Sequence, residues 1–181
     1  NGLEENVLKK AVCSLLALFA VLLSSCSGKE GEKTGEFSKG DIKLTLGDQT
    51  FYFGQDAKPL LDFLGVPDDT EEILSCYYEG YDKTFKYVKV HITSYPREGK
   101  DILDEALFYD ATYSFKGGVR VGSTKDDVIK SYGDKFFMDG ELMVYNETNN
   151  KSDIESPRLS FTLKNDKVTT VYFDSNSYFQ D

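Results

Sequence analysis

The chain has 181 residues and a formal net charge of −10, with 31 Asp and Glu against 21 Lys and Arg. It contains 12 Tyr and 13 Phe but no Trp, a composition that favours β-strands. Because an acidic surface repels phosphate groups, the charge argues against nucleic acid as a partner.

Residues 8–26 carry the first clear signal. Lys9 and Lys10 form a short basic region, and an uncharged apolar run from Ala11 to Leu23 follows. A helix needs about 20 residues to span a hydrocarbon core of about 30 Å, so this run is too short to be a membrane anchor. It is typical of the hydrophobic region of a secretory signal peptide.

The apolar run ends with Leu23, Ser24, Ser25 and Cys26. This ending resembles the lipobox of bacterial lipoproteins, where a leucine and two small residues precede the cysteine that receives a diacylglyceryl group. The resemblance implies that residues 1–25 are the signal peptide and that Cys26 carries the lipid. Two acyl chains are sufficient for stable anchoring. We therefore expect the membrane to be one partner, and the protein to be held on the outer side of the cytoplasmic membrane, or in an outer membrane where one is present. An ordinary cleaved signal peptide is the alternative.

The first residues do not fit a signal peptide. Asn1 is not an initiator, and Glu4 and Glu5 are acidic where such peptides are basic. Either residues 1–6 extend upstream of the true start, close to Val7, or the chain is a fragment.

Residues 26–38 are rich in Gly and in charges of both signs. Such a composition cannot bury a core, so we expect a flexible tether. We assign residues 39–110 to a first folded unit and residues 111–181 to a second.

Cysteine usage excludes an intramolecular disulfide in the mature chain. Cys13 leaves with the signal peptide and Cys26 is lipidated, so Cys76 is the cysteine that is left. Cys76 lies in an apolar stretch that resembles a strand, and we predict that it is a small buried residue.

Segments 54–65 and 122–133 align without a gap, with Gly at both ends of each. Their apolar residues are spaced to lie on one face of a helix, and the terminal Gly suits a left-handed cap. Thr124 with Asp127 matches a capping box, and Pro59 suits a first helical turn. The pattern predicts one short helix in each segment. Helices this short need a surface to pack on.

Alternating apolar residues predict antiparallel strands around both helices. They comprise residues 50–53, 72–78, 84–95 and 102–109 in the first unit, and residues 112–121, 141–146, 158–164 and 167–173 in the second. Asn165 and Asp166 are typical of a tight turn between the last two. The expected fold class is therefore α+β, with two tandem units that each pack a short helix on an antiparallel sheet.

Residues 118–133 read Gly-Val-Arg-Val-Gly-Ser-Thr-Lys-Asp-Asp-Val-Ile-Lys-Ser-Tyr-Gly. This motif, and the tandem helix-on-sheet pattern predicted for the whole chain, resemble the β-lactamase-inhibitor-protein fold and its single-copy lipoprotein relatives in the outer-membrane assembly machinery. The motif is also similar to small uncharacterised lipoproteins of Gram-positive gut bacteria. The first copy departs from the motif at Asp62 and Phe63. The resemblance implies a scaffold that binds another protein.

Residues that support catalysis are scarce. His91 is the only histidine, and no partner for acid–base or metal chemistry can be identified for it. Residues 68–72 contain four carboxylates without the ligand spacing of a calcium loop, which favours a solvated acidic turn and leaves calcium binding open. We therefore predict no enzymatic activity, no metal and no cofactor.

Aromatic side chains are concentrated between the two units' helices. Tyr77, Tyr78, Tyr81, Phe85 and Tyr87 alternate with charged residues and could form a recognition surface, because Tyr offers a large contact area at low entropy cost. Packing in the core is the alternative use of these rings. We expect a non-catalytic protein-binding or envelope-assembly module. A carbohydrate-binding lipoprotein and a glycan-processing enzyme with paired carboxylates are the alternatives.

Overall fold

The computed structural model describes residues 35–177. The predicted signal peptide, Cys26 and the predicted tether up to residue 34 lie outside the described residues. Within residues 35–177, no helix combines the length and the apolar character needed to cross a membrane.

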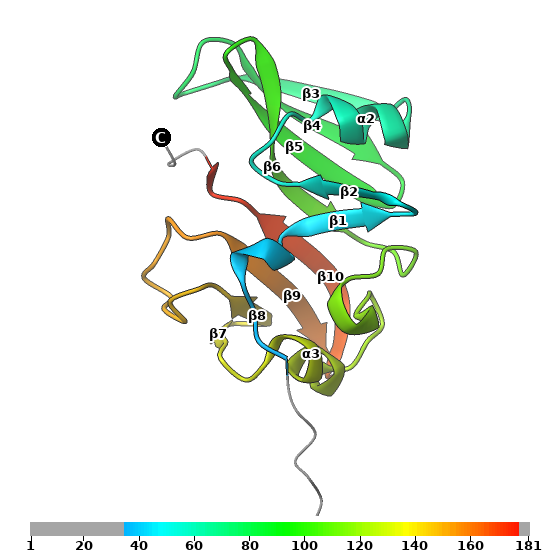
Figure 1. The fold of residues 1–181 in the computed structure, drawn as a ribbon, viewed down its shortest axis with the longest axis vertical. Coiled ribbons are helices and arrows are strands. Elements are labelled where there is room, and N and C mark those ends of the chain that lie inside the picture. Colours follow the sequence, from blue (N-terminus) through cyan, green and yellow to red (C-terminus); the bar gives the residue numbers. More distant parts are fainter. Residues whose placement is uncertain (1–34, 178–181) are drawn as a thin grey trace, which may run out of the picture. The chain divides into compact units, whose positions relative to one another are not determined.

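Eight antiparallel strands form one sheet in the order β3-β4-β5-β6-β10-β9-β8-β7 (Figure 1). One half contains β3 (Asp69–Leu74), β4 (Tyr81–Tyr87), β5 (Val90–Arg97) and β6 (Lys100–Phe108). The other half contains β7 (Phe137–Asp139), β8 (Leu142–Tyr145), β9 (Arg158–Lys164) and β10 (Lys167–Asp174). The halves join where β6 pairs with β10, with Phe108 opposite Val171 and Ala106 opposite Phe173.

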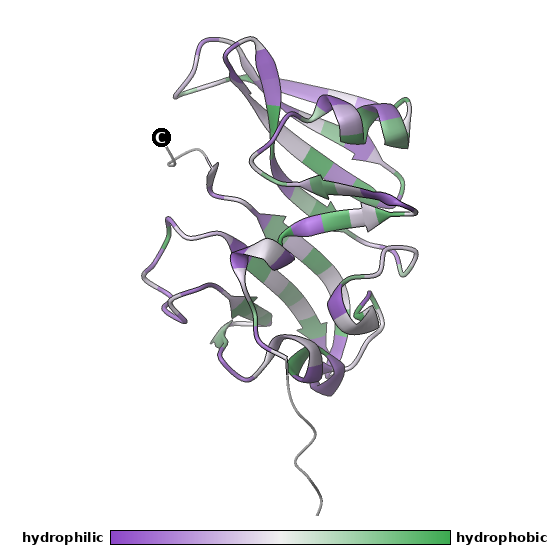
Figure 2. Ribbon diagram, viewed as in Figure 1, coloured by the Kyte–Doolittle hydropathy of each residue, from purple (hydrophilic) through white to green (hydrophobic). Residues whose placement is uncertain are grey.

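The remaining elements cover one face of this sheet (Figure 1). They are the hairpin of β1 (Lys43–Leu46) and β2 (Gln49–Tyr52), the helices α2 (Lys58–Leu64) and α3 (Lys125–Tyr132), and 3-10 turns at Lys39–Asp41 and Lys116–Gly118. Hydrophobic residues recur along β9 and β10, as period-two strands with one buried face require (Figure 2). The core lies between the sheet and these covering elements.

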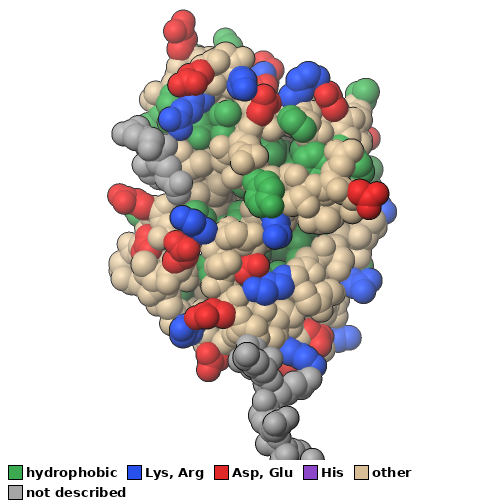
Figure 3. Space-filling model, in the orientation of Figure 1, with side chains coloured by type: hydrophobic (Ala, Val, Ile, Leu, Met, Phe, Trp, Pro, Cys, Tyr) green, Lys and Arg blue, Asp and Glu red, His purple; other side chains and the backbone are tan. Residues whose placement is uncertain are grey.

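Hydrophobic side chains are also exposed on the side of the molecule that carries the covering elements. Figure 3 shows them over the half that carries α2 and β1–β2, with acidic and basic side chains between and around them. Tyr52 of β2 and Phe63 of α2 belong to the exposed hydrophobic residues of this region.

The predicted fold class is wrong. The described chain is mainly β, with one eight-stranded and one two-stranded sheet, and it does not form two tandem helix-on-sheet units. The physical reason lies at β6 and β10. Separate sheets would leave the backbone groups of both strands unpaired and would expose Phe108 and Phe173, whereas pairing the two strands satisfies the backbone and buries both rings.

The helix signals are confirmed. The side chain of Thr124 accepts a hydrogen bond from the Asp127 amide, and the Asp127 carboxylate accepts one from the Thr124 amide. Pro59 lies in the first turn of α2. Both helices end at a glycine with positive φ, Gly65 and Gly133, as predicted, but their ψ angles of −154° and −177° are not those of the left-handed cap that the sequence predicts.

Two strand predictions are wrong. Residues 84–95 form two strands, β4 and β5, because Val88 and Lys89 make a two-residue turn between the paired residues Tyr87 and Val90. Residues 112–121 form no strand, since positive φ angles at two consecutive glycines, 117 and 118, break the extended chain.

Residues 35–38, which the sequence places in the tether, contact the fold. The Gly35 amide donates to the Lys130 carbonyl oxygen at 2.8 Å, and the ring of Phe37 lies 5.8 Å from that of Tyr145. A Cβ atom on Gly35 would lie 1.9 Å from the carbonyl oxygen of Ser131. Only glycine therefore permits this approach to α3.

We predict that Phe173→Ala lowers the free energy of unfolding by about 3–5 kcal/mol, because Phe173 is fully buried and contacts Phe108 and Phe115 at ring distances of 5.3 and 5.1 Å. Urea unfolding followed by circular dichroism measures the change. Phe63→Ala, on the exposed side of α2, is the control and should cost less than half as much. Equal losses in the two variants would show that the β6–β10 junction is not the centre of the core.

Candidate functional site

The five aromatic residues predicted as one binding surface lie in different settings. Phe85 and Tyr87 pack against the core. Tyr78 is half-buried and stacks on Tyr95, with ring centroids 5.3 Å apart and planes inclined by 19°. The structure therefore leaves Tyr77 and Tyr81 exposed and uses the other three for packing.

The exposed pair belongs to a group of exposed apolar residues at one end of the β3–β4 hairpin, which we call the hairpin tip: Ile73, Leu74, Tyr77 and Tyr81. Their exposed fractions are 72%, 67%, 67% and 50%. Ile73 lies on the opposite face of the strand from Leu74. Leu74 and Tyr81 are direct partners across the two strands. The exposure of Ile73 and Leu74 is not predicted from the sequence, because their apolar pattern indicates a strand with a buried face. The acidic residues just before them were the available signal of an exposed strand.

The connection between the two strands is held in place. The Ser75 amide donates to the Gly80 carbonyl oxygen at 3.0 Å, and the Ser75 hydroxyl accepts from the amides of Tyr77 and Tyr78. Gly80 lies so close to Pro96 that a Cβ atom there would be 3.0 Å from the proline ring. The hairpin tip is thus a fixed surface on the end of the sheet.

Cys76 lies in this connection and is exposed. The prediction that it is a small buried residue is wrong. Apolar neighbours indicate burial only where one face of a strand is covered, and β3 is an edge strand whose side chains face solvent on both sides.

The predicted acidic turn is part of β3. Lys86 of β4 forms ion pairs with Asp69, at 3.4 Å, and with Glu71. The hydrogen bond to Glu71 is the main reason why the pKa of Lys86 lies above its ordinary value. Glu72 is exposed and has no ion pair within residues 35–177.

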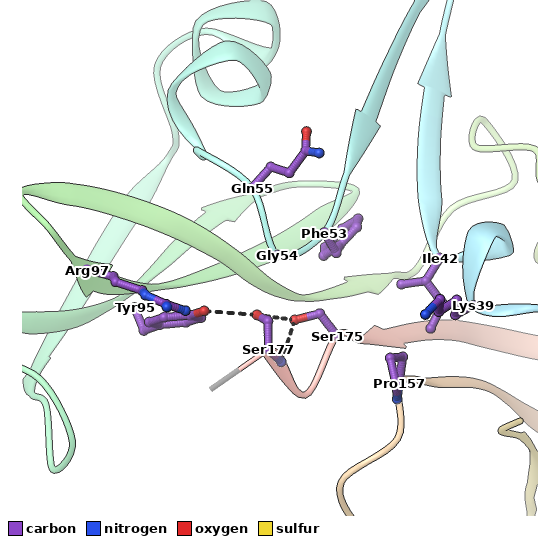
Figure 4. Close-up of a pocket in the computed structure, with 10 residues that line it drawn as sticks. All are labelled: Lys39, Ile42, Phe53, Gly54, Gln55, Tyr95, Arg97, Pro157, Ser175 and Ser177. Carbon is purple, nitrogen blue, oxygen red and sulfur yellow. Dashed lines mark hydrogen bonds between the residues drawn. The ribbon is translucent and has the colours of Figure 1, made fainter. Parts of the chain in front are cut away.

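A pocket of about 490 Å³ opens on another part of the sheet. Beyond Asp104, β10 diverges from β6, and residues 53–55 take its place: the Gly54 amide donates to the Leu103 carbonyl oxygen at 2.7 Å. The pocket lies at this split (Figure 4) and is lined by Lys39, Ile42, Phe53, Gly54, Gln55, Tyr95, Arg97, Pro157, Ser175 and Ser177.

Buried hydroxyl groups form a continuous chain along this pocket. Tyr95 donates to Ser177 at 3.1 Å, the hydroxyls of Ser177 and Ser175 are 2.7 Å apart, and Ser175 donates to Asp104 at 2.9 Å. Figure 4 shows Arg97 beside Tyr95 at one end of the pocket and Lys39 at the other. Two cations and several hydroxyls suit a hydroxylated or anionic small molecule, but these residues contain no nucleophile with a histidine base.

Two carboxylates near the pocket have raised pKa values. Burial raises the pKa of Asp104 to about 7, against the hydrogen bond from Ser175, and raises that of Asp174 to about 6. Glu105 lies opposite Asp174 across the strands and adds its charge to both. None of the three lines the pocket. Asp174 accepts from the Asn176 amide, so these groups hold the chain that follows β10.

His91 does not belong to a catalytic or metal-binding cluster in the part of the chain that the structure describes. Its Nδ1 lies 2.9 Å from the hydroxyl of Tyr109. Within residues 35–177, no three His, Cys, Asp or Glu side chains are placed to hold a metal ion.

Comparison with protein-family models and with curated proteins finds no match to this chain. Among solved structures, the chain is similar to an extracellular protein containing an SCP domain from Bacillus anthracis str. Ames. The identity is 13% and the TM-score is 0.43, with 74% of this chain and 50% of that chain covered. The chain therefore spans about half the length of that protein, and so weak a likeness carries no argument about function.

We predict that the free energy of unfolding falls as the pH rises from about 4 to about 7. The pKa of Asp104 is about 7 in the folded state and has an ordinary value of 3.8, so the folded state holds this proton more tightly than the unfolded chain does. Asp174 acts in the same direction up to about pH 6.

Urea unfolding at several pH values tests this expectation on the wild type and on Asp104→Asn, which keeps an acceptor oxygen for Ser175 without a charge. The variant should lose roughly half of the pH dependence, the remainder coming from Asp174. An unchanged slope in the variant would contradict the assignment.

Proposed function

We propose that the protein is a non-catalytic binding module of the cell envelope, anchored outside the cytoplasm by a lipid on Cys26, and that it captures another protein with the hairpin tip. The observation that carries this proposal is the exposure of Ile73, Leu74, Tyr77 and Tyr81 at the end of the β3–β4 hairpin, whose connection is held by hydrogen bonds and packing. The lipobox resemblance at residues 23–26 supports the anchor.

The chemistry of the hairpin tip favours a protein partner. Neighbouring exposed apolar side chains that adjoin polar residues are typical of protein–protein contact sites. Tyrosine adds a large contact area with two rotatable bonds and a hydroxyl that tolerates water.

The fixed geometry of the tip lowers the cost of binding. Tyr78 anchors the connection to Tyr95, and Gly80 rests on Pro96. A backbone that is already fixed loses less conformational entropy when a partner covers it. The stacking of Tyr78 on Tyr95 therefore fixes the connection, while Tyr77 and Tyr81 supply contact area.

A carbohydrate-binding function is the second candidate, because the pocket at the β6–β10 split combines hydroxyl groups with the aromatic rings of Phe53 and Tyr95. Binding to a glycan array that is lost in Tyr95→Phe, and kept in hairpin-tip variants, would favour it. Loss of glycan binding in the hairpin-tip variants alone would favour the hairpin tip over the pocket as the binding site.

We predict that Ile73→Ser combined with Tyr77→Ser reduces capture of an envelope protein by at least about tenfold, since a loss of about 1.4 kcal/mol corresponds to that factor. The measurement is quantitative mass spectrometry after pull-down from an envelope extract. Val66→Ser combined with Ile154→Ser removes exposed apolar side chains elsewhere and should leave capture unchanged. Equal capture by both variants would exclude the hairpin tip.

We also predict that an alkyne-bearing fatty acid labels the full-length protein in cells through Cys26. The Cys26→Ser variant should lose both the label and its recovery in the membrane fraction. A Cys76→Ser variant controls for acylation of the exposed thiol and should keep both. A wild type without label, recovered in the soluble fraction, would remove the anchor from the proposal.

A further inference from the structure

β3 is an edge of the eight-stranded sheet, and its six residues are all exposed. Its hydrogen bonds to β4 run from the pair Ser75–Gly80 through every second residue. The backbone N–H and C=O groups of Thr70, Glu72 and Leu74 therefore point away from β4. No other strand within residues 35–177 pairs with this edge.

The edge has an acidic half and an apolar half. Asp68, Asp69, Glu71 and Glu72 lie at its beginning, and Lys86 neutralises only part of their charge through Asp69 and Glu71. Ile73 and Leu74 at its end lead into the hairpin tip.

Charge selects among the possible occupants of this edge. A second copy of the chain, paired through the same strand, would bring the carboxylates of both copies into one strand pair, and like charges there are destabilising. A strand with Lys or Arg side chains would pair with them favourably. Like-charged edges are a common protection against self-association, and they leave an oppositely charged strand free to bind.

We infer that β3 is an acceptor edge that binds an extended, Lys- or Arg-bearing segment of a partner protein as an additional antiparallel or parallel strand. This inference rests on the proposed function and gives the partner its chemistry. Backbone hydrogen bonds to Thr70, Glu72 and Leu74 supply affinity, as in other cases of strand addition.

Side chains of the incoming strand alternate between the two faces of the sheet, so residues of β3 on both faces contact them. Glu72 shares a face with Lys83, its partner on β4, while Asp69 and Glu71 share the opposite face with Lys86. The segment therefore carries basic residues on both faces along the acidic half. Next to Ile73 and Leu74 it carries apolar residues, which extend its contact to the hairpin tip.

The probe is a short, terminally blocked peptide in which a run of Lys is followed by a run of Val, so that basic side chains lie on both faces of the added strand. The peptide with the reversed order covers the other strand direction, and binding is measured by fluorescence anisotropy at two salt concentrations. We expect saturable binding that weakens at high salt. The same peptide with every backbone amide N-methylated cannot donate backbone hydrogen bonds to β3 and should not bind. A peptide with Glu in place of Lys should not bind either. Binding of the N-methylated peptide equal to that of its parent would overturn the inference.

Two variants test the edge itself. Thr70→Pro removes an outward N–H and leaves the hydrogen bonds to β4 in place, so it should abolish peptide binding while an unchanged melting temperature shows that the fold persists. Glu72→Lys should weaken binding of the Lys peptide by at least about tenfold. Glu147→Lys makes the same change of charge at an exposed residue elsewhere and should bind like the wild type.

The remaining outcomes separate this inference from the proposed function. If the wild type dimerises in sedimentation experiments and Thr70→Pro is monomeric, a second copy occupies the edge and the inference is wrong. If Thr70→Pro captures the envelope protein as the wild type does, while the Ile73→Ser, Tyr77→Ser variant does not, strand addition fails and the hairpin tip stands. If neither variant changes capture, the proposed function itself fails.

Discussion

The pairing of β6 with β10 is the constraint on which the rest of the structure depends. These strands come from distant parts of the chain, and their register places Phe108 and Phe173 in one aromatic cluster with Phe115. The covering elements then follow, since the β1–β2 hairpin and both helices bury their apolar residues against the surface that the joined strands create.

The same junction explains where polar groups are buried. β10 pairs with only the last part of β6, so the backbone groups at the start of β6 need another partner. Residues 54–57 supply it through hydrogen bonds to Asp101 and Leu103. The chain after β10 must leave the sheet at this point. Hydrogen bonds join the buried polar side chains at this point, which are Asp104, Ser175, Ser177 and Tyr95. The buried Asp104, whose pKa is raised, therefore lies next to the pocket.

Local signals in the sequence predicted local structure well. The capping residues of α3, the proline of α2 and the Asn165–Asp166 turn, where both φ angles are positive, depend on neighbours a few residues away. The joining of β6 to β10 depends on partners more than sixty residues apart, and no residue pattern marks it. The turn at Val88 and Lys89 lacks the Gly, Asn or Pro that usually marks a turn. Of the site, Tyr77 and Tyr81 were predicted. Ile73, Leu74 and the pocket were not, because exposure at a sheet edge is decided by strand order.

The docking of Gly35 on α3 limits how far the lipid anchor that we propose can lie from the folded chain. Nine peptide links separate Cys26 from Gly35, so a fully extended connection spans roughly 30 Å at most. α3 packs through Tyr132 on Tyr145 and Phe161, in the half of the sheet that ends at β7. β3 is the opposite border of the same sheet. If Cys26 carries the lipid that we propose, its attachment point lies within this distance of Gly35, and the half of the sheet that carries α3 is the one joined directly to the anchor.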